Sequence, residues 1–408
     1  MRAYLDILRI AEARRLFLAL LGVRLGYAMI SVSVSLLAHE RSGSWATAGL
    51  AVGVFSLMAG ATAPLRGHLV DRYGQTWPVA VYVPAFCLAL ALMPVAHGAT
   101  AIVVLAGVGG ATSPPVIASA RPLWRDIVGA ERLRTAYAAD STQTQATMIV
   151  GAPVAYAVTT ATSAASSLYI ITVLVLIGGV QFLLLPTSRR WRGADRLDHV
   201  KSALHAEGMR TLVILAACIG AVFGTVAVAL PAWVVGHGSR STGVVLLGIV
   251  AVGGVVGGAW WGTRGSGSPV RALVVSTSVM AVAFVPVAFV RSAWVLGGLL
   301  LVVGACVGIG NVLGLELIDR AAPPGTAVSA FTWMVFTESA GMGLASTLAG
   351  HVIQAHGASV ALGLAAVPAV FVPVMLAMRR RTLRAGQWPA SSQLEPAPTE
   401  TSSGTLSS

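Results

Sequence analysis

The sequence predicts an all-α membrane protein with twelve transmembrane helices arranged in two six-helix pseudo-repeats. Composition and hydropathy support this fold class. Hydrophobic residues make up 56% of the 408 residues and charged residues only 10%, whereas a soluble chain carries a far more charged surface. The mean hydropathy is +0.80. Apolar stretches of about 18 or more residues, long enough to cross a bilayer, recur along the whole chain.

Short polar segments separate these apolar stretches and set the expected ends of the helices. Arg24 interrupts the first stretch, so we expect an uncleaved first helix and not a signal peptide. The first half is expected to span the membrane at residues 16–38, 45–65, 78–97, 100–120, 136–160 and 166–187. The second half is expected to do so at 209–232, 241–262, 270–290, 293–316, 327–351 and 356–378.

Positive charge gathers on one side of this topology. A net charge of +12 and a pI near 10.7 suggest a nucleic-acid partner at first sight. However, 23 of the 27 Lys and Arg residues fall on the side of the two termini, and only Arg41, Arg240 and Arg291 fall in the opposite loops. The positive-inside rule then places both termini in the cytoplasm. We therefore expect a multi-pass protein of the cytoplasmic membrane, embedded in lipid and without a nucleic-acid partner.

The chain divides into two halves of similar pattern. We expect an N-terminal half at residues 1–187, a polar cytoplasmic linker at 188–208 and a C-terminal half at 209–380. Residues 381–408 are rich in Ser, Thr, Pro and Gly and are expected to form a disordered cytoplasmic tail. A shift of about 195 residues places Gly and Thr residues of the first half on the same residue types in the second, which supports an internal repeat.

A short polar segment, residues 66–74, lies between the second and third predicted spans. We expect it to be a tight turn, because Gly67 and Gly74 permit backbone conformations that other residues avoid. With Asp71 and Arg72 they form a Gly-x-x-x-Asp-Arg-x-Gly pattern. At this position the pattern resembles the signature of the major facilitator superfamily, a large family of secondary transporters.

The resemblance covers about residues 10–380. It implies alternating access of a small-molecule substrate to a cavity between the two halves, without a cofactor. It also implies that the signature segment latches the halves together, with Asp71 bonded to the positively polarised start of the eleventh helix near Ala327. We expect the transporter to be a monomer.

The fourth and fifth predicted helices bear on the direction of transport. Gly151-Ala152-Pro153 is similar to the Gly-Pro element that efflux members of the family carry in the fifth helix, which favours export. The fourth helix, by contrast, lacks the Arg that many drug antiporters of the family carry, and Arg24 is a candidate to supply that charge. Pro114-Pro115 and Pro153 remove backbone donors and should bend both helices.

Three ionisable residues, Arg24, Asp140 and Glu338, lie within predicted spans, where each costs a few kcal/mol, and we expect them to take part in proton coupling or to line the central cavity. Arg24 and Asp140 lie on the cytoplasmic side of neighbouring helices and are expected to pair; the alternative is that each reaches the interface alone. Glu338 lies near the midplane, where loss of water favours its neutral form. We expect it to carry protons, and a structural acid bonded to a backbone carbonyl is the alternative.

Tyr27, Thr144, Asn311 and Trp333 are candidates to line the substrate cavity. For the two aromatic residues, an anchoring role at the membrane interface is equally compatible with the sequence. We expect no metal site, because the three cysteines lie far apart without Cys/His spacing.

No catalytic motif is present, so we expect no enzyme. The sequence therefore predicts a transporter that exports a small organic molecule, with protons as the coupling ion. An importer of a small metabolite and a membrane sensor that kept the fold without transport are the alternatives.

Overall fold

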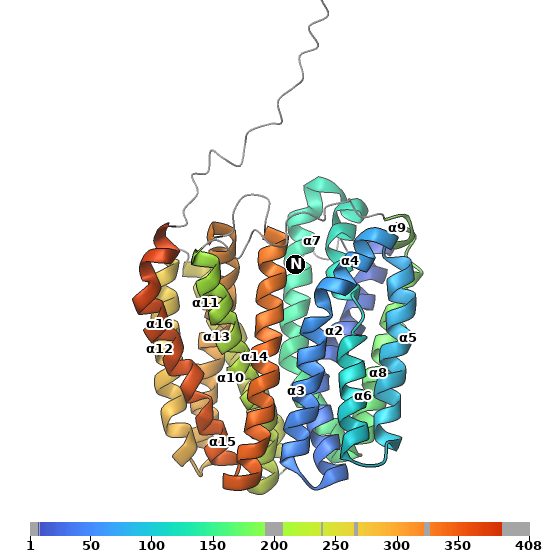
Figure 1. Ribbon diagram of the computed structural model, residues 1–408. Helices are drawn as coiled ribbons and strands as arrows, with labels where there is room; N and C mark the ends of the chain where they lie inside the picture. Colours follow the sequence, from blue (N-terminus) through green and yellow to red (C-terminus); the bar gives the residue numbers. More distant parts are fainter. Residues whose placement is uncertain are drawn as a thin grey trace, which may run out of the picture.

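The protein is a bundle of long helices in the computed structural model (Figure 1). The residues that the structure describes are 7, 9–191, 207–237, 240–264, 268–321 and 327–385. The first half contains α2 (Ala11–Ser42), α3 (Trp45–Ala61), α4 (Ala63–Tyr73), α5 (Thr76–Leu92), η1 (Met93–Val95), α6 (Ala99–Ala111), α7 (Val116–Ala161), α8 (Ala164–Leu183) and α9 (Pro186–Arg190). The second half contains α10 (Glu207–His237), α11 (Arg240–Arg264), α12 (Pro269–Phe284), η3 (Val285–Phe289), α13 (Ala293–Ala321), α14 (Ala327–His356), α15 (Ala358–Leu364) and α16 (Ala366–Ala385).

Ten helical segments of the described chain are long and apolar enough to cross a membrane. They match ten of the twelve predicted spans. The two others, 136–160 and 327–351, coincide with the second part of α7 and with α14, which run through the same bundle but are less apolar (Figure 1). The described residues contain no strand, and the predicted all-α membrane fold is confirmed.

Several segments expected to be irregular are helical. Residues 66–74 do not form a turn: α4 continues the second span to Tyr73, and Pro64 lies in its first turn, where the missing N–H of proline costs no hydrogen bond. Only Gly74, with φ of 78°, breaks the helix. The expected loop at 121–134 is likewise helical apart from Gly129, which has φ of 74°. Most of the linker and tail lies outside the described residues.

The N-terminal and C-terminal halves stand side by side in Figure 1. We call the end of the bundle where α2 begins and α16 ends the termini side, and the opposite end the far side. The halves meet mainly through two helix pairs, α3 with α14 and α7 with α11, and α10 and α14 make smaller contacts with α2, α3 and α4. In Figure 1, α3 and α14 lie next to each other at the centre of the bundle.

The contact between α3 and α14 begins at the far side, where the backbone N–H of Trp45 donates to Oε1 of Gln354 at 3.1 Å. It continues past Gly49 and Gly53 to Gly60, where an added Cβ would lie 2.6 Å from Cβ of Ser339. We call this contact, from Trp45 to Gly60, the α3–α14 seal. It consists largely of small residues, which let two helix backbones approach closely.

The second pair, α7 and α11, also meets at the far side. The ring of Tyr156, near the end of α7, lies against Gly243, near the start of α11. Pro153, one turn earlier, lies near Gly248. The described contacts between the halves are thus concentrated on the far side, and the conformation is closed there.

Small residues also pack helices within a half. Gly254 and Gly258 on α11 lie against Gly304 and Gly308 on α13, so glycines at a spacing of four residues form the contact of these two helices.

Gly308→Ala should destabilise the protein, because its Cβ would overlap the backbone carbonyl of Gly254, which cannot rotate away. We expect a loss of about 1–3 kcal/mol, the usual cost of overpacking, measured as a lower melting temperature in detergent. Gly298→Ala is the matched control on the same helix, because nothing lies within 4 Å of its added Cβ. Equal melting temperatures for the two variants would contradict the packing.

Candidate functional site

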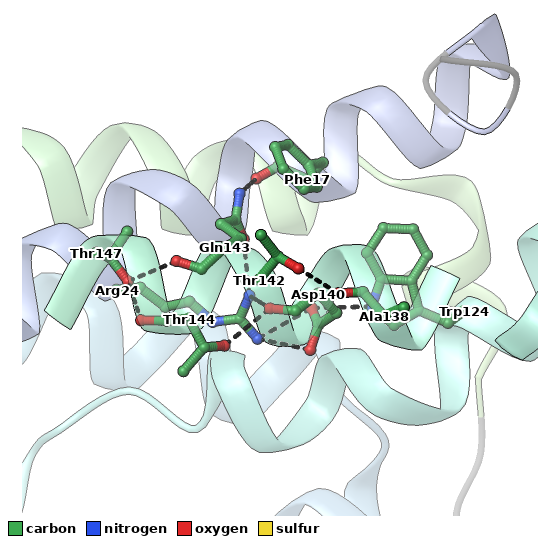
Figure 2. Close-up of polar contacts among 9 residues, drawn as sticks. All are labelled: Phe17, Arg24, Trp124, Ala138, Asp140, Thr142, Gln143, Thr144 and Thr147. Atoms are coloured by element: carbon green, nitrogen blue, oxygen red, sulfur yellow. Dashed lines mark hydrogen bonds and ion pairs between the residues drawn. The ribbon is translucent and has the colours of Figure 1, made fainter. Parts of the chain in front are cut away.

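Arg24 and Asp140 form a buried ion pair between α2 and α7 (Figure 2). Nη2 of Arg24 donates to both carboxylate oxygens of Asp140, at 3.0 and 2.9 Å. The side chains are only 6% and 14% exposed. The predicted pairing is therefore confirmed, and neither side chain reaches the membrane interface alone.

Further hydrogen bonds surround this pair (Figure 2). Gln143 lies one turn after Asp140 and accepts from Nη1 of Arg24 at 2.7 Å through Oε1. Its amide nitrogen donates to the backbone carbonyl of Phe17 at 2.8 Å, which ties α7 to the first turns of α2. The indole N–H of Trp124 donates to Oδ1 of Asp140 at 3.1 Å. Trp124, which lies 16 residues before Asp140 and beyond the Gly129 break, was not among the predicted site residues.

This cluster is electrically balanced. One cation and one carboxylate face each other, and most of the remaining donors and acceptors are used. Nε of Arg24 is the exception, since it is buried without a hydrogen-bond partner. A pair of this kind is stable only as a pair, because removal of one member leaves a charge that is buried without compensation.

Glu338 lies in a different setting, on α14. Its backbone carbonyl faces Gly220 of α10, and its neighbour Ser339 lies against Gly60 of α3. Glu338 thus lies at the inner end of the α3–α14 seal, about 24 Å from Gln354 at a rise of 1.5 Å per residue. The side chain of Glu338 is exposed, and many protein atoms also lie around it. Within the described chain, its carboxyl has no hydrogen-bond or ion-pair partner.

The signature residues lie on the termini side. Asp71 and Arg72 are exposed on α4, and the Arg72 guanidinium lies 5.4 Å from the ring centre of Tyr73. Among the residues that the structure describes, none bonds to the Asp71 carboxylate. The side chain of Ala327 lies outside the described residues, so the latch stays a prediction.

Gln75, directly after the signature, anchors this segment to the first half. It is fully buried, and its amide donates to the carbonyl of Ser119 at 2.9 Å and accepts from the hydroxyl of Ser188 at 3.1 Å. The signature helix therefore belongs rigidly to the N-terminal half.

The four cavity candidates have different surroundings. The Tyr27 hydroxyl donates to the carbonyl of Pro114 at 3.0 Å. Thr144 donates to the carbonyl of Asp140, one turn earlier in α7, at 2.9 Å. Trp333 is partly exposed on α14. The side chain of Asn311 lies outside the described residues. The structure does not bring these residues together into one group, and their role in substrate binding stays a prediction.

Arg66 was missed as a site residue. It is only 8% exposed, and its guanidinium donates to the carbonyls of Ala59 and Ser113. The glycines and charges of residues 66–74 suggested one polar turn, in which a buried Arg is not expected. Arg24, by contrast, bonds to Asp140 and Gln143 in the second part of α7, which is the fifth span, and its role in place of an Arg on the fourth helix stays a prediction.

Two pseudo-symmetric helical halves with a contact between them define a polytopic membrane protein of the transporter type. The family model of the major facilitator superfamily matches residues 16–346, and the chain belongs to this family. No curated protein matches the chain.

Three solved structures with the same fold are distant in sequence. The nucleoside transporter NupG is 13% identical, with a TM-score of 0.70 over 90% of this chain and 99% of that chain. A bacterial homologue of the human lysosomal transporter Spinster, inward-facing and unoccupied, is 12% identical, with a TM-score of 0.73 over 93% and 99%. The human organic anion transporter MFSD10 is 14% identical, with a TM-score of 0.63 over 89% and 98%. At these identities the likeness shows the fold alone.

Either single substitution, Arg24→Leu or Asp140→Leu, should destabilise the protein by about 3–5 kcal/mol, because each leaves one buried charge without its partner. The double variant should regain part of this loss, since it removes both charges. Thermal unfolding in detergent measures the effect. Trp124→Phe removes one hydrogen bond to Asp140 and keeps an aromatic ring, so it serves as a mild control. A double variant less stable than both single variants would refute the pairing as a stabilising unit.

Proposed function

We propose that this protein is a secondary active transporter that moves a small organic molecule by alternating access, as proton-coupled efflux. The family and the two-half fold support secondary transport. The observation that carries the proton coupling is Glu338, a carboxyl at the inner end of the α3–α14 seal that has no partner among the described residues. Import of a small metabolite remains the alternative direction.

Glu338 suits a proton carrier because of where it lies. In the present conformation the seal closes the far side, while the carboxyl beyond it is exposed. If the seal opened and the termini side closed, the same carboxyl would become accessible from the far side. A group that is reached from alternate sides can load a proton on one side and release it on the other.

The Arg24–Asp140 pair has another role in this proposal. A proton on Asp140 would leave Arg24 buried without a counter-charge, so the ion pair is kept. The pair then holds α2 against α7 whether or not Glu338 carries a proton. The N-terminal half then moves as one body.

The proposed orientation places the termini side in the cytoplasm, because nearly all Lys and Arg residues lie there. The transporter would then reside in the cytoplasmic membrane as a monomer, with lipid, protons and its substrate as partners.

Everted membrane vesicles from an overexpressing strain test this function. Respiration acidifies their interior, and a pH-sensitive acridine dye reports the gradient. Compounds from a panel of drugs, sugars and nucleosides are added one at a time. For a proton-coupled exporter, at least one compound should collapse part of the gradient, and vesicles without the protein should show no effect. Uptake of a labelled sugar or nucleoside into cells, driven by an acid pulse, would instead support import.

Glu338→Gln should abolish transport driven by a pH gradient while exchange of substrate across vesicles without a gradient survives. The amide cannot carry a proton but fills nearly the same space. The measurement is gradient-driven transport compared with counterflow, using the compound found in the panel. Glu131→Gln, an exposed carboxyl of α7, is the control with the same change. If Glu338→Gln still moves substrate against its gradient, Glu338 is structural.

Asp71→Asn should slow transport several-fold without loss of protein from the membrane, because the latch requires a carboxylate at the positive end of a helix. Initial transport rates, normalised to protein amount, measure this change. Asp126→Asn, an exposed carboxylate on the same side, is the control. Wild-type rates for Asp71→Asn would exclude the latch.

A further inference from the structure

The fourth membrane helix is interrupted between Ala111, where α6 ends, and Val116, where α7 begins. Pro114 and Pro115 cause the break, since neither has an N–H to donate to the preceding turn. The break lies about 20 Å from the far-side start of α6 at a rise of 1.5 Å per residue, so it lies within the thickness of a bilayer. Backbone carbonyls freed there cannot be satisfied by lipid.

Side chains from neighbouring helices satisfy three of these carbonyls. The hydroxyl of Thr62, between α3 and α4, donates to the carbonyl of Ala111 at 3.1 Å. Tyr27 donates to the carbonyl of Pro114 at 3.0 Å. Arg66 donates to the carbonyl of Ser113 through Nη1.

Arg66 makes a second hydrogen bond, to a backbone carbonyl outside the break. Its Nη2 donates to the carbonyl of Ala59, in the last turn of α3. Among the described residues, no carboxylate pairs with this guanidinium, although it is buried. The ends of two helices, α3 and α6, supply the compensation, because each helix C-terminus carries a partial negative charge of about half a unit.

A buried cation is a costly way to satisfy one carbonyl, since a hydroxyl such as that of Thr62 does so without a charge. Arg66, like Thr62, joins the break to the last turns of α3, and it adds a buried charge to this joint. Ala59, its second acceptor, precedes Gly60, which lies at the inner end of the α3–α14 seal against Ser339. Glu338 is the next residue along α14.

We propose that Arg66 is a positioning residue of the transport cycle. By binding Ala59 and Ser113 at the same time, it fixes the interrupted fourth helix to the inner end of the seal. Movement of α3 against α14 is then passed to the start of α7. This inference rests on the proposed alternating access, and it assigns to Arg66 the coupling of the seal to the fourth helix.

Distances between spin labels test this role in protein whose three native cysteines are replaced by Ala. Tyr73 of α4, Ala118 just after the break and Arg271 of α12 are exposed and accept labels. The 73–271 and 118–271 pairs report movement between the halves, and the 73–118 pair reports the joint that Arg66 holds. Each pair is measured at about pH 5.5 and about pH 8, on either side of neutrality, in lipid nanodiscs.

In protein with Arg66 intact, both inter-half distances should shift together with pH, and the 73–118 distance should stay narrow. In Arg66→Met, the 73–271 distance should still shift while the 118–271 distance does not follow it, and the 73–118 distribution should at least double in width. Arg66→Lys keeps the charge but not the forked geometry and should fall between the two. Arg125→Met removes an exposed charge of α7 and should leave all three distances unchanged.

If the 118–271 distance of Arg66→Met follows the 73–271 distance as in the parent protein, the proposal is wrong. A purely structural loss would alter both distances alike or lower the melting temperature without separating them, and either result also overturns it. If no distance shifts with pH in the parent protein, the proton coupling fails instead, and the 73–118 pair decides on Arg66 alone. If Arg66→Met does not fold, the 73–118 width of Arg66→Lys decides, and an unchanged width refutes the role.

Discussion

Inside a bilayer, a polar group has no water to bind, so the protein itself must supply each partner. The N-terminal half is organised by this constraint. Arg24 is balanced by a carboxylate, and Arg66 by the carbonyl ends of two helices. Each arrangement ties together segments that are distant in sequence: α2 to α7 in one case, and α3 to the interrupted fourth helix in the other.

The two halves differ in how their charged side chains within the membrane spans are compensated. This difference suits a transporter in which the contact between the halves moves. In the first half the buried charges that the structure describes are compensated, which makes that half rigid. In the second half Glu338 has no described partner and lies where the two halves separate. In the proposed transport cycle, a change in its charge would act on the neighbouring α3–α14 seal, which among the described residues is held by one hydrogen bond, between Trp45 and Gln354, and otherwise by packing.

The sequence predicted the spans well, because hydropathy is summed over about 20 residues and tolerates local error. It also predicted the Arg24–Asp140 pair, since two opposite charges at similar depth on neighbouring helices need each other. It failed at residues 66–74, where glycines and charges suggested a turn although Pro64 is compatible with the first turn of a helix. Burial of Arg66 depends on the break at Pro114-Pro115, more than 40 residues away, and no local pattern reports such a contact.

Pro114-Pro115 nevertheless indicates from the sequence alone that other parts of the chain must contact the fourth helix at this depth. Two adjacent prolines within a span remove two donors at membrane depth, so donors must come from elsewhere in the chain. The residues able to donate at that depth are few: hydroxyls such as those of Tyr27 and Thr62, and a cation such as Arg66 at the end of the second span. Counting the acceptors that a break exposes, and then seeking the donors that reach them, turns a helix-breaking motif into a prediction of tertiary contacts.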